Sequence, residues 1–291
     1  MKEIAIIGST ASGKTALSLE IANKTNSIIL SLDSLCVYKE IEIASAKPTF
    51  EDRGDIIHFG IDEVYPNVEF DVIKFIELYK KAKDYAFKND KNLIIVGGTG
   101  FYLKALIDGL SQGIETKIKL DIPQEDAYDL LYKIDKEYME KIEKNDRYRI
   151  EKAYAIYKQT SLGPTQYFQK NPKIAVAKDL KIFEILWDKE ELKNRILKRT
   201  KIMINSGIID EVIFLEKKYT REPNSMSSIG IIETLEYLDG KLTKQELEEK
   251  ISANTAKLAK RQNTFNKGQF LDKTSNIIEN LNSDIIKYFS L

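Results

Sequence analysis

Eight residues near the start of the chain have the types and the spacing of a phosphate-binding loop. They match the pattern G-x-x-x-x-G-K-T: Gly8, Ser9, Thr10, Ala11, Ser12, Gly13, Lys14 and Thr15. Glycines let the backbone wrap around phosphate oxygens, and successive N–H groups at a helix N-terminus point at the anion. We therefore predict that Lys14 neutralises phosphate charge and that the Thr15 hydroxyl binds Mg²⁺. A chance glycine-rich turn is the alternative.

Two polar residues follow the next apolar segments. Asp33 comes directly after residues 27–32, and Thr99 lies between glycines after residues 92–96. The carboxyl ends of parallel strands meet at one edge of a sheet, where ligands bind. Asp33 could there hold Mg²⁺ through a water, act as a general base on an acceptor group, or cap the turn before Ser34. The Thr99 hydroxyl could donate or accept in the same cleft, unless the segment is a plain tight turn.

Basic residues gather in two segments that contain no acidic residue. Residues 193–209 and 250–271 each hold five: Lys193, Arg195, Lys198, Arg199 and Lys201 in the first; Lys250, Lys257, Lys260, Arg261 and Lys267 in the second. Arg195 and Arg199 are four apart and share one helix face, which suits either a phosphate contact or a solvated surface. The second segment suits an RNA backbone. Between residues 140 and 152, basic and acidic residues are mixed, so charge alone does not indicate whether this segment binds RNA.

The elements that position these residues follow from hydrophobic spacing. Residues 3–7, 27–32 and 92–96 are predicted strands, and residues 14–23 and 70–88 are predicted helices. The phosphate pattern therefore has the strand before it and the helix after it that it requires. Strands that alternate with helices indicate a doubly wound parallel sheet.

The pattern changes after Gly113. Residues 124–172 have helical spacing and many charges, residues 181–187 look like a returning strand, and everything from Lys189 reads as helices. We predict an α/β fold: a P-loop NTPase-like parallel sheet core with C-terminal helices, residues 1–112 and 179–291, and a helical insertion domain, residues 113–178. Thr243 to Glu246 fits a capping box at the start of one C-terminal helix.

Composition excludes several classes of protein. The 291 residues hold 45 basic and 45 acidic side chains, so the whole surface is not a basic coat for nucleic acid. One cysteine, Cys36, and one histidine, His58, exclude an internal disulfide, a multi-cysteine zinc site and a histidine-rich metal site. His58 lies in an apolar segment and is expected to have a structural or weak RNA-facing role. With no membrane-length apolar run and no signal-peptide pattern, we expect a cytoplasmic protein without a membrane partner.

Six short segments occur in an order typical of one family. Residues 8–15 are close to G-P-T-A-S-G-K-T, 31–39 to S-V-D-S-M-Q-V-Y-R, 43–48 to I-G-T-A-K-P, 96–106 to V-G-G-T-G-L-Y-F-K-A-L, 145–149 to N-D-x-x-R, and 258–262 to Y-A-K-R-Q. Together they resemble the bacterial tRNA dimethylallyltransferase (adenosine isopentenyltransferase) family. Several independent motifs in order are far more specific than the phosphate loop alone.

The resemblance implies transfer of a dimethylallyl group from its diphosphate to N6 of the adenosine 3′ to the anticodon of tRNA. It implies catalytic roles for Lys14, Asp33 and Thr99, with Mg²⁺ as cofactor and Arg199 joining the phosphate loop at the diphosphate. Asp33 would take the amine proton, and Thr99 would position the amine or the bridging oxygen. The implied tRNA-binding residues are Asp33, Ser34, Leu35, Cys36, Arg147, Arg149, Lys152, Lys260 and Arg261. The partners would be the anticodon loop and dimethylallyl diphosphate, and we expect a monomer.

The chain departs from the family pattern at a few positions. Ser9 replaces Pro, Cys36 replaces a common Gln, Ile231 and Ile232 replace a Tyr and a basic residue, and Ala256 replaces a common Arg. The stretch after Ser111 is shorter than usual. Ser9 lies in the otherwise intact phosphate loop, and we interpret the other departures as variation at the tRNA-facing periphery.

Two other functions use the same loop. A small-molecule or nucleotide kinase would use the insertion as a lid, but kinases do not typically combine Asp33-Ser34, Ala46-Lys47-Pro48 and Gly97-Gly98-Thr99. A non-catalytic RNA-binding protein would not need the intact Lys14, Thr15 and Asp33.

Overall fold

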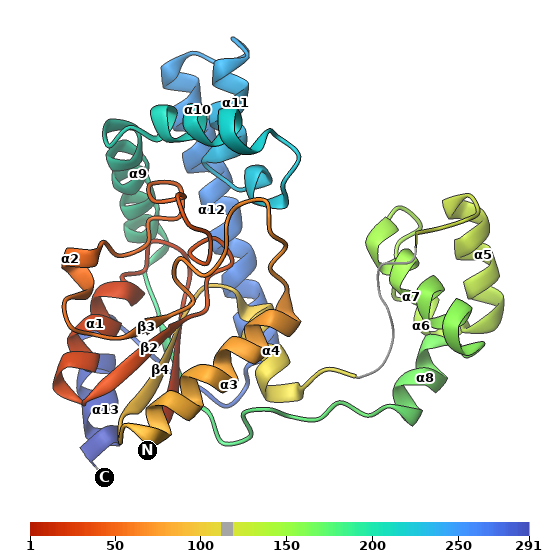
Figure 1. Ribbon diagram of the computed structural model, residues 1–291, viewed down its shortest axis with the longest axis horizontal. Helices are drawn as coiled ribbons and strands as arrows, with labels where there is room; N and C mark the ends of the chain where they lie inside the picture. Colours follow the sequence, from red (N-terminus) through yellow and green to blue (C-terminus); the bar gives the residue numbers. More distant parts are fainter. Residues whose placement is uncertain (112–118, 291) are drawn as a thin grey trace. The chain divides into compact units, whose positions relative to one another are not determined.

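The computed structural model describes residues 1–111 and 119–290 (Figure 1). The chain divides into two compact units, a core unit of Met1–Lys104 with Asp179–Leu291 and a helical unit of Ala105–Lys178. The predicted boundary between residues 112 and 113 lies outside the described residues. Among the described residues, no helix is both long enough and apolar enough to cross a membrane.

The core unit contains the sheet and most helices. Its elements in chain order are β1 (Glu3–Ile7), α1 (Lys14–Lys24), β2 (Ser27–Ser31), α2 (Phe50–Arg53), β3 (His58–Phe59), α3 (Val72–Lys88), β4 (Asn92–Gly97), the start of α4 (Gly100–Asp108), β5 (Lys181–Ile185), α9 (Lys189–Asn205), α10 (Ile208–Tyr219), the 3₁₀ helix η1 (Asn224–Ser227), α11 (Ile231–Leu238), α12 (Lys244–Gln269), β6 (Thr274–Asn276) and α13 (Ile278–Ser290).

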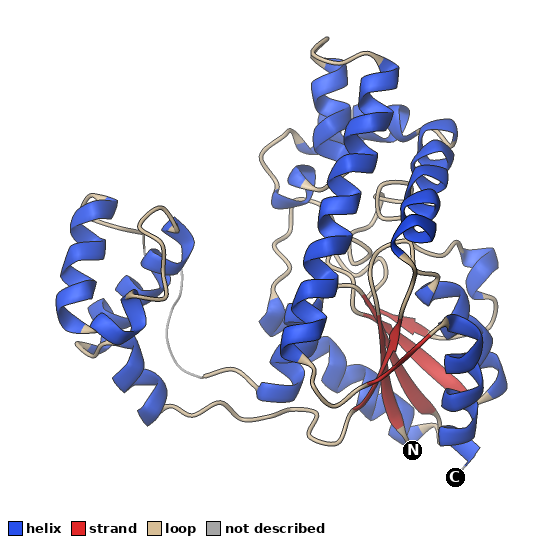
Figure 2. Ribbon diagram, turned by 180° about the vertical axis from the view of Figure 1, so that it is seen from behind, coloured by secondary structure: helices blue, strands red, loops and turns tan. Residues whose placement is uncertain are grey.

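The six strands form one parallel sheet in the order β3-β2-β4-β1-β5-β6. In the centre, Ile6 of β1 lies opposite Val96 of β4 and Phe183 of β5. Parallel strands need crossover connections, so helices lie on both sides of the sheet, as Figure 2 shows. The predicted α/β class with a parallel sheet is confirmed.

Apolar side chains attach the helices to this sheet. Ile4 and Ile6 are fully buried and belong to one cluster with Leu17 of α1 and Leu281 of α13. Helix α3 packs against β2 and β4, and its Tyr79 hydroxyl donates to Glu3 Oε2 at 2.8 Å. Because neighbouring residues of a strand point to opposite faces, continuous apolar strands such as β1 can bury both faces.

Two details of the predicted elements are wrong. The helix expected from residue 70 begins at Val72, because the Asp71 carboxylate accepts the N–H groups of Ile73 and Lys74, both at 3.0 Å, and caps the first turn. The region after Lys189 is not wholly helical, since β6 pairs with β5 at the edge of the sheet. This strand is three residues long and polar, so hydrophobic spacing gives no sign of it.

The helices α9 to α12 form the second half of the core unit around a cluster that includes Val37 and Ile41. Glu211 of α10 reaches the turn after Ile41, where its carboxylate accepts three backbone N–H groups, from Glu42, Ile43 and Ala44, at 2.7–2.9 Å. The segment after β2 is therefore held by α10. The predicted capping box of Thr243 and Glu246 is present at the start of α12.

The helical unit consists of the end of α4 and α5 (Gln124–Ile134), α6 (Lys136–Met139), α7 (Arg147–Thr160) and α8 (Pro164–Lys170). Its own core includes Leu131, Met139 and Ile150. The buried Asp135 carboxylate accepts the N–H groups of Tyr138 and Thr165, at 3.1 and 2.6 Å, and thereby joins the start of α6 to α8.

Candidate active site

The phosphate loop connects β1 to α1 with the backbone that its glycines allow. Gly13 has φ of +89° and immediately precedes Lys14, the first residue of α1. That left-handed conformation is costly for any residue with a Cβ atom. Lys14 Nζ folds back over the loop and donates to Ser9 O at 2.6 Å and to Ser12 Oγ at 3.4 Å. The loop thus places an ammonium group at its own centre.

Two side chains from the β5–α9 region donate hydrogen bonds to carbonyl groups of the loop. Arg195 Nε donates to Ala11 O at 2.7 Å, and Trp187 Nε1 donates to Ser12 O at 2.8 Å. The Arg195 guanidinium stacks on the Trp187 ring, 4.3 Å from its centroid. A carbonyl and the N–H of the same trans peptide point in opposite directions, so the bond from Trp187 to Ser12 O also fixes the direction of the Gly13 N–H. The Ser12 N–H donates within the loop, to Ser9 O at 3.3 Å. This arrangement prepares the loop for an anion.

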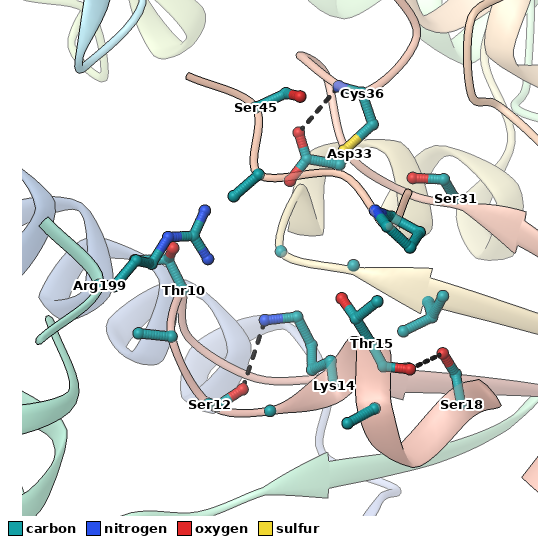
Figure 3. A pocket seen from close by; sticks show the side chains of 18 of the residues that line it. Thr10, Ser12, Lys14, Thr15, Ser18, Ser31, Asp33, Cys36, Ser45 and Arg199 are labelled. Atoms are coloured by element: carbon teal, nitrogen blue, oxygen red, sulfur yellow. Dashed lines mark hydrogen bonds between the residues drawn. The ribbon is translucent and has the colours of Figure 1, made fainter. Parts of the chain in front are cut away.

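A first cavity of about 510 Å³ opens above the loop. Its walls include Lys14, Thr15, Asp33 and Arg199, and Figure 3 shows the three charged side chains turned toward a common space. Burial lowers the pKa of Lys14 to about 8, with Asp33 opposing the shift and Arg199 adding to it. Burial also lowers the pKa of Arg199, again against the attraction of Asp33. Two partly desolvated cations in one cavity favour a polyanionic ligand.

Asp33 follows β2 and uses one oxygen for local structure. Its Oδ1 accepts the N–H of Leu35 at 2.9 Å and that of Cys36 at 3.4 Å. The turn-capping role considered from the sequence is therefore present. The same carboxylate lines the first cavity, where it is close enough to Lys14 and Arg199 to affect the pKa of both.

Thr99 contacts Ser34, the residue that follows Asp33. Its hydroxyl accepts the N–H of Ser34 at 3.3 Å, and its own N–H donates to Leu32 O at 3.2 Å. Gly97 makes this approach possible, because a Cβ atom there would lie 2.4 Å from Leu32 O. Asp33 and Thr99 therefore lie at the same edge of the sheet, as expected from their places after two parallel strands.

A second cavity of about 500 Å³ adjoins the first. It is lined by Ser34, Thr99, Phe101 and Phe265 among others, and it shares part of its wall with the first cavity: Thr10, Asp33, Ser45, Gly98, Arg199, Leu258 and Gln262. One cavity therefore presents a phosphate loop and the other presents aromatic rings and hydroxyls. Asp33 borders both.

The glycines after β4 serve protein packing as well. A Cβ atom on Gly98 would lie 2.4 Å from Gln262 Nε2, and one on Gly100 would lie 2.6 Å from Phe265 Cδ1. Both partners belong to α12. The lack of a Cβ atom at these two glycines thus allows α12 to approach closely.

The basic residues predicted for tRNA divide between the two units. Lys260 and Arg261 are exposed on α12, and neither forms an ion pair with the described part of the chain; a broad third cavity beside them also involves Lys257. In the helical unit, Arg147 pairs with Glu151 at 2.8 Å and Arg149 with Asp146 at 3.4 Å. Lys152 Nζ lies 5.2 Å from the centroid of the exposed Tyr148 ring.

Some features of the site were not evident from the sequence. The loop contact of Trp187, the position of Phe101 in the wall of the second cavity and the packing roles of Gln262 and Phe265 were not predicted, although Gln262 is part of the 258–262 motif. The thiol of Cys36 is buried, and burial raises its pKa, which disfavours the thiolate form that a nucleophilic cysteine needs. His58 Nδ1 contacts Ile56 O at 2.8 Å in β3, and burial lowers the pKa of its ring.

A parallel α/β sheet with a phosphate loop at its carboxyl edge defines the class of P-loop proteins, here with a second cavity beside the loop. Family models described as IPP transferase and isopentenyl transferase match residues 36–269 and 1–62. The chain belongs to this isopentenyl transferase family, and the resemblance drawn from its motifs is confirmed.

Individual relatives agree with the family. A tRNA dimethylallyltransferase of Aliarcobacter butzleri is 81% identical over 100% of both chains, and one of Sulfurimonas denitrificans is 51% identical over 98% of both. Among solved structures, a tRNA delta(2)-isopentenylpyrophosphate transferase from Staphylococcus epidermidis has a TM-score of 0.73 at 29% identity, covering 100% of this chain and 99% of that one. A eukaryotic dimethylallyltransferase acting on tRNA has a TM-score of 0.81 at 26% identity, covering 96% and 74%.

Proposed function

We propose that the chain is a tRNA dimethylallyltransferase, which moves the dimethylallyl group of dimethylallyl diphosphate to N6 of the adenosine 3′ to the anticodon. The observation that carries the proposal is the junction of two cavities at Asp33. One side suits a diphosphate, and the other suits a planar base entering from the basic face of α12. The names of the relatives support the same activity.

In this reaction the bond between the first prenyl carbon and the bridging oxygen breaks, and a bond from that carbon to N6 forms. The departing diphosphate gains negative charge, which Lys14, Arg199 and the inward N–H groups of the loop stabilise. The adenine amine becomes positive and gives one proton to Asp33. Thr99 lines the second cavity together with this carboxylate, and its hydroxyl would orient the amine or the bridging oxygen.

Mg²⁺ fits the oxygen ligands of the first cavity. Among the described residues there is no group of three histidine, cysteine or acidic side chains that could hold a metal ion. Mg²⁺ commonly takes one or two protein ligands and completes its shell with phosphate oxygens and water. The Thr15 hydroxyl and, through water, Asp33 would hold it. Bound there, Mg²⁺ would neutralise part of the charge on the diphosphate.

The acceptor base must leave its stack to reach Asp33, as in other enzymes that modify a base. Phe101 and Phe265 line the route and offer rings for stacking. The tRNA backbone would lie along Lys260 and Arg261. The turn of Ser34, Leu35 and Cys36 would border the target base, and the insertion, residues 113–178, would add Arg147, Arg149 and Lys152. We further propose a monomer that acts in the cytoplasm.

The direct test is incubation of the protein with labelled dimethylallyl diphosphate, Mg²⁺ and tRNA from a strain that lacks the modification. Nucleoside analysis should find the label in N6-dimethylallyladenosine, and the Lys14→Ala variant should give far less. A parallel reaction with γ-labelled ATP serves as control. Label transferred from ATP, with none from the prenyl donor, would instead establish a kinase.

A further inference from the structure

Gln262 of α12 makes two hydrogen bonds to two different loops of the site. Its Oε1 accepts the N–H of Thr10, in the phosphate loop, at 2.8 Å. Its Nε2 donates to Gly98 O, in the loop that carries Thr99, at 3.0 Å. The amide group is therefore a bridge between a loop that follows β1 and a loop that follows β4.

The surroundings show that the bridge is tightly built. A Cβ atom at position 98 would lie 2.4 Å from Gln262 Nε2 and would displace this amide from Gly98 O. Gln262 lines both the first and the second cavity. Gln262 directly follows the exposed residues Lys260 and Arg261 on the same helix, so the residue that joins the two loops adjoins these basic side chains. The Thr10 N–H is engaged by Gln262, and other N–H groups of the loop remain to meet an anion.

We infer that Gln262 is a positioning residue that keeps the donor loop and the acceptor loop at the separation that the reaction needs. The inference rests on the proposed function, in which the diphosphate lies at Thr10 to Thr15 and the amine lies between Asp33 and Thr99. Reacting atoms must meet at about 3–3.5 Å, and a misplacement of about 1 Å can cost roughly 10²-fold in rate. A rigid amide between the two loops controls that distance without touching either reacting atom.

The experiment compares Gln262→Met, Gln262→Glu and a matched control, Asn263→Ala, which truncates the adjacent exposed side chain. Methionine keeps the length but makes neither hydrogen bond. Glutamate still accepts from Thr10 but, when ionised at pH 8, cannot donate to Gly98. Each protein is measured for single-turnover prenyl transfer, for dimethylallyl diphosphate and tRNA affinity, for thermal stability, and for hydrogen exchange of the Thr10 amide.

We expect Gln262→Met to slow single-turnover transfer by about 10–100-fold while both dissociation constants change less than about threefold. Exchange at Thr10 should accelerate at least about tenfold in Gln262→Met and stay slow in Gln262→Glu, although transfer by Gln262→Glu should also be slow. The Asn263→Ala control should match the wild type.

The inference would be overturned if Gln262→Met transferred the prenyl group at the wild-type rate. It would also be overturned if the loss of rate were fully explained by weaker binding or lower thermal stability. Unchanged Thr10 exchange would overturn it as well, and this readout does not depend on the reaction. A wild-type protein that transfers no prenyl group would instead overturn the proposed function.

Discussion

Asp33 Oδ1 accepts the N–H of Leu35 at 2.9 Å, while the same carboxylate faces Lys14 and Arg199 across the first cavity. One side chain thus caps a turn and supplies charge at the site. The two contributions can be separated, because the cap needs only an oxygen acceptor whereas proton transfer needs a basic carboxylate.

We predict that Asp33→Asn slows the chemical step by about 10²–10⁴-fold, the usual effect of losing a positioned general base. The amide oxygen can still accept from Leu35, so stability and donor binding should change little. Single-turnover kinetics over a series of Mg²⁺ concentrations would measure the effect. A rate close to that of the wild type at every concentration would refute the general base, and recovery in excess Mg²⁺ would assign Asp33 to the metal.

The control for this prediction is Asp33→Ala, which removes the cap as well. It should lower the free energy of unfolding by about 0.5–2 kcal/mol, as for other lost caps. Urea unfolding of the two variants would separate the cap from the chemistry.

Binding of dimethylallyl diphosphate should weaken as the pH rises above about 8. The pKa of Lys14 is lowered to about 8 by burial, so the free protein loses this positive charge as the pH rises through about 8. The ligand contributes no change there, because a phosphate ester has its second pKa near ~6. Trp187 is the single tryptophan and contacts the loop at Ser12 O, so its fluorescence can report the dissociation constant.

The Lys14→Met variant should bind weakly at all of these pH values and show no such slope. The lowered pKa of Lys14 also affects the stability of the folded protein. Lysine has a higher pKa in the unfolded chain, which therefore binds more protons between pH 8 and 10.5, so this group makes the free energy of unfolding rise with pH there. An affinity of the wild type that stays constant from pH 7 to 9.5 would contradict the assignment of Lys14 to the diphosphate.

Replacing Lys260 and Arg261 together with alanine should weaken tRNA binding and flatten its salt dependence. Each phosphate contact contributes about 0.7–0.9 to the slope of log affinity against log salt, so the slope should fall by about 1.4–1.8. The matched control is Lys80→Ala with Lys81→Ala, which removes two exposed charges from α3. If both double variants gave the wild-type slope, this face of α12 would not contact tRNA phosphates.

Gly97→Ala should destabilise the protein, because the new Cβ atom would lie 2.4 Å from a backbone oxygen, Leu32 O, and the ends of β2 and β4 would have to separate. We expect a loss of about 1–3 kcal/mol. Gly268→Ala in α12 is the contrasting control, since no atom beyond its own neighbouring turns of helix lies within 4 Å of its Cβ position. It should gain up to about 1 kcal/mol from helix propensity. Equal unfolding free energies for the two variants would argue against the steric account of Gly97.

The sequence by itself determined the elements whose causes are local. The phosphate loop could be recognised because its glycines, Lys14 and Thr15 act within eight residues, between a strand and a helix that also have local signals. The parallel sheet followed from alternating strands and helices, and the position of Asp33 followed from its place at the end of β2.

The tertiary structure decided whatever depends on residues that are distant in the chain. It brought Gln262 to Thr10 across 252 positions and added the polar strand β6 to the edge of the sheet. No local pattern encodes these contacts, because each depends on a packing partner that only the folded chain supplies.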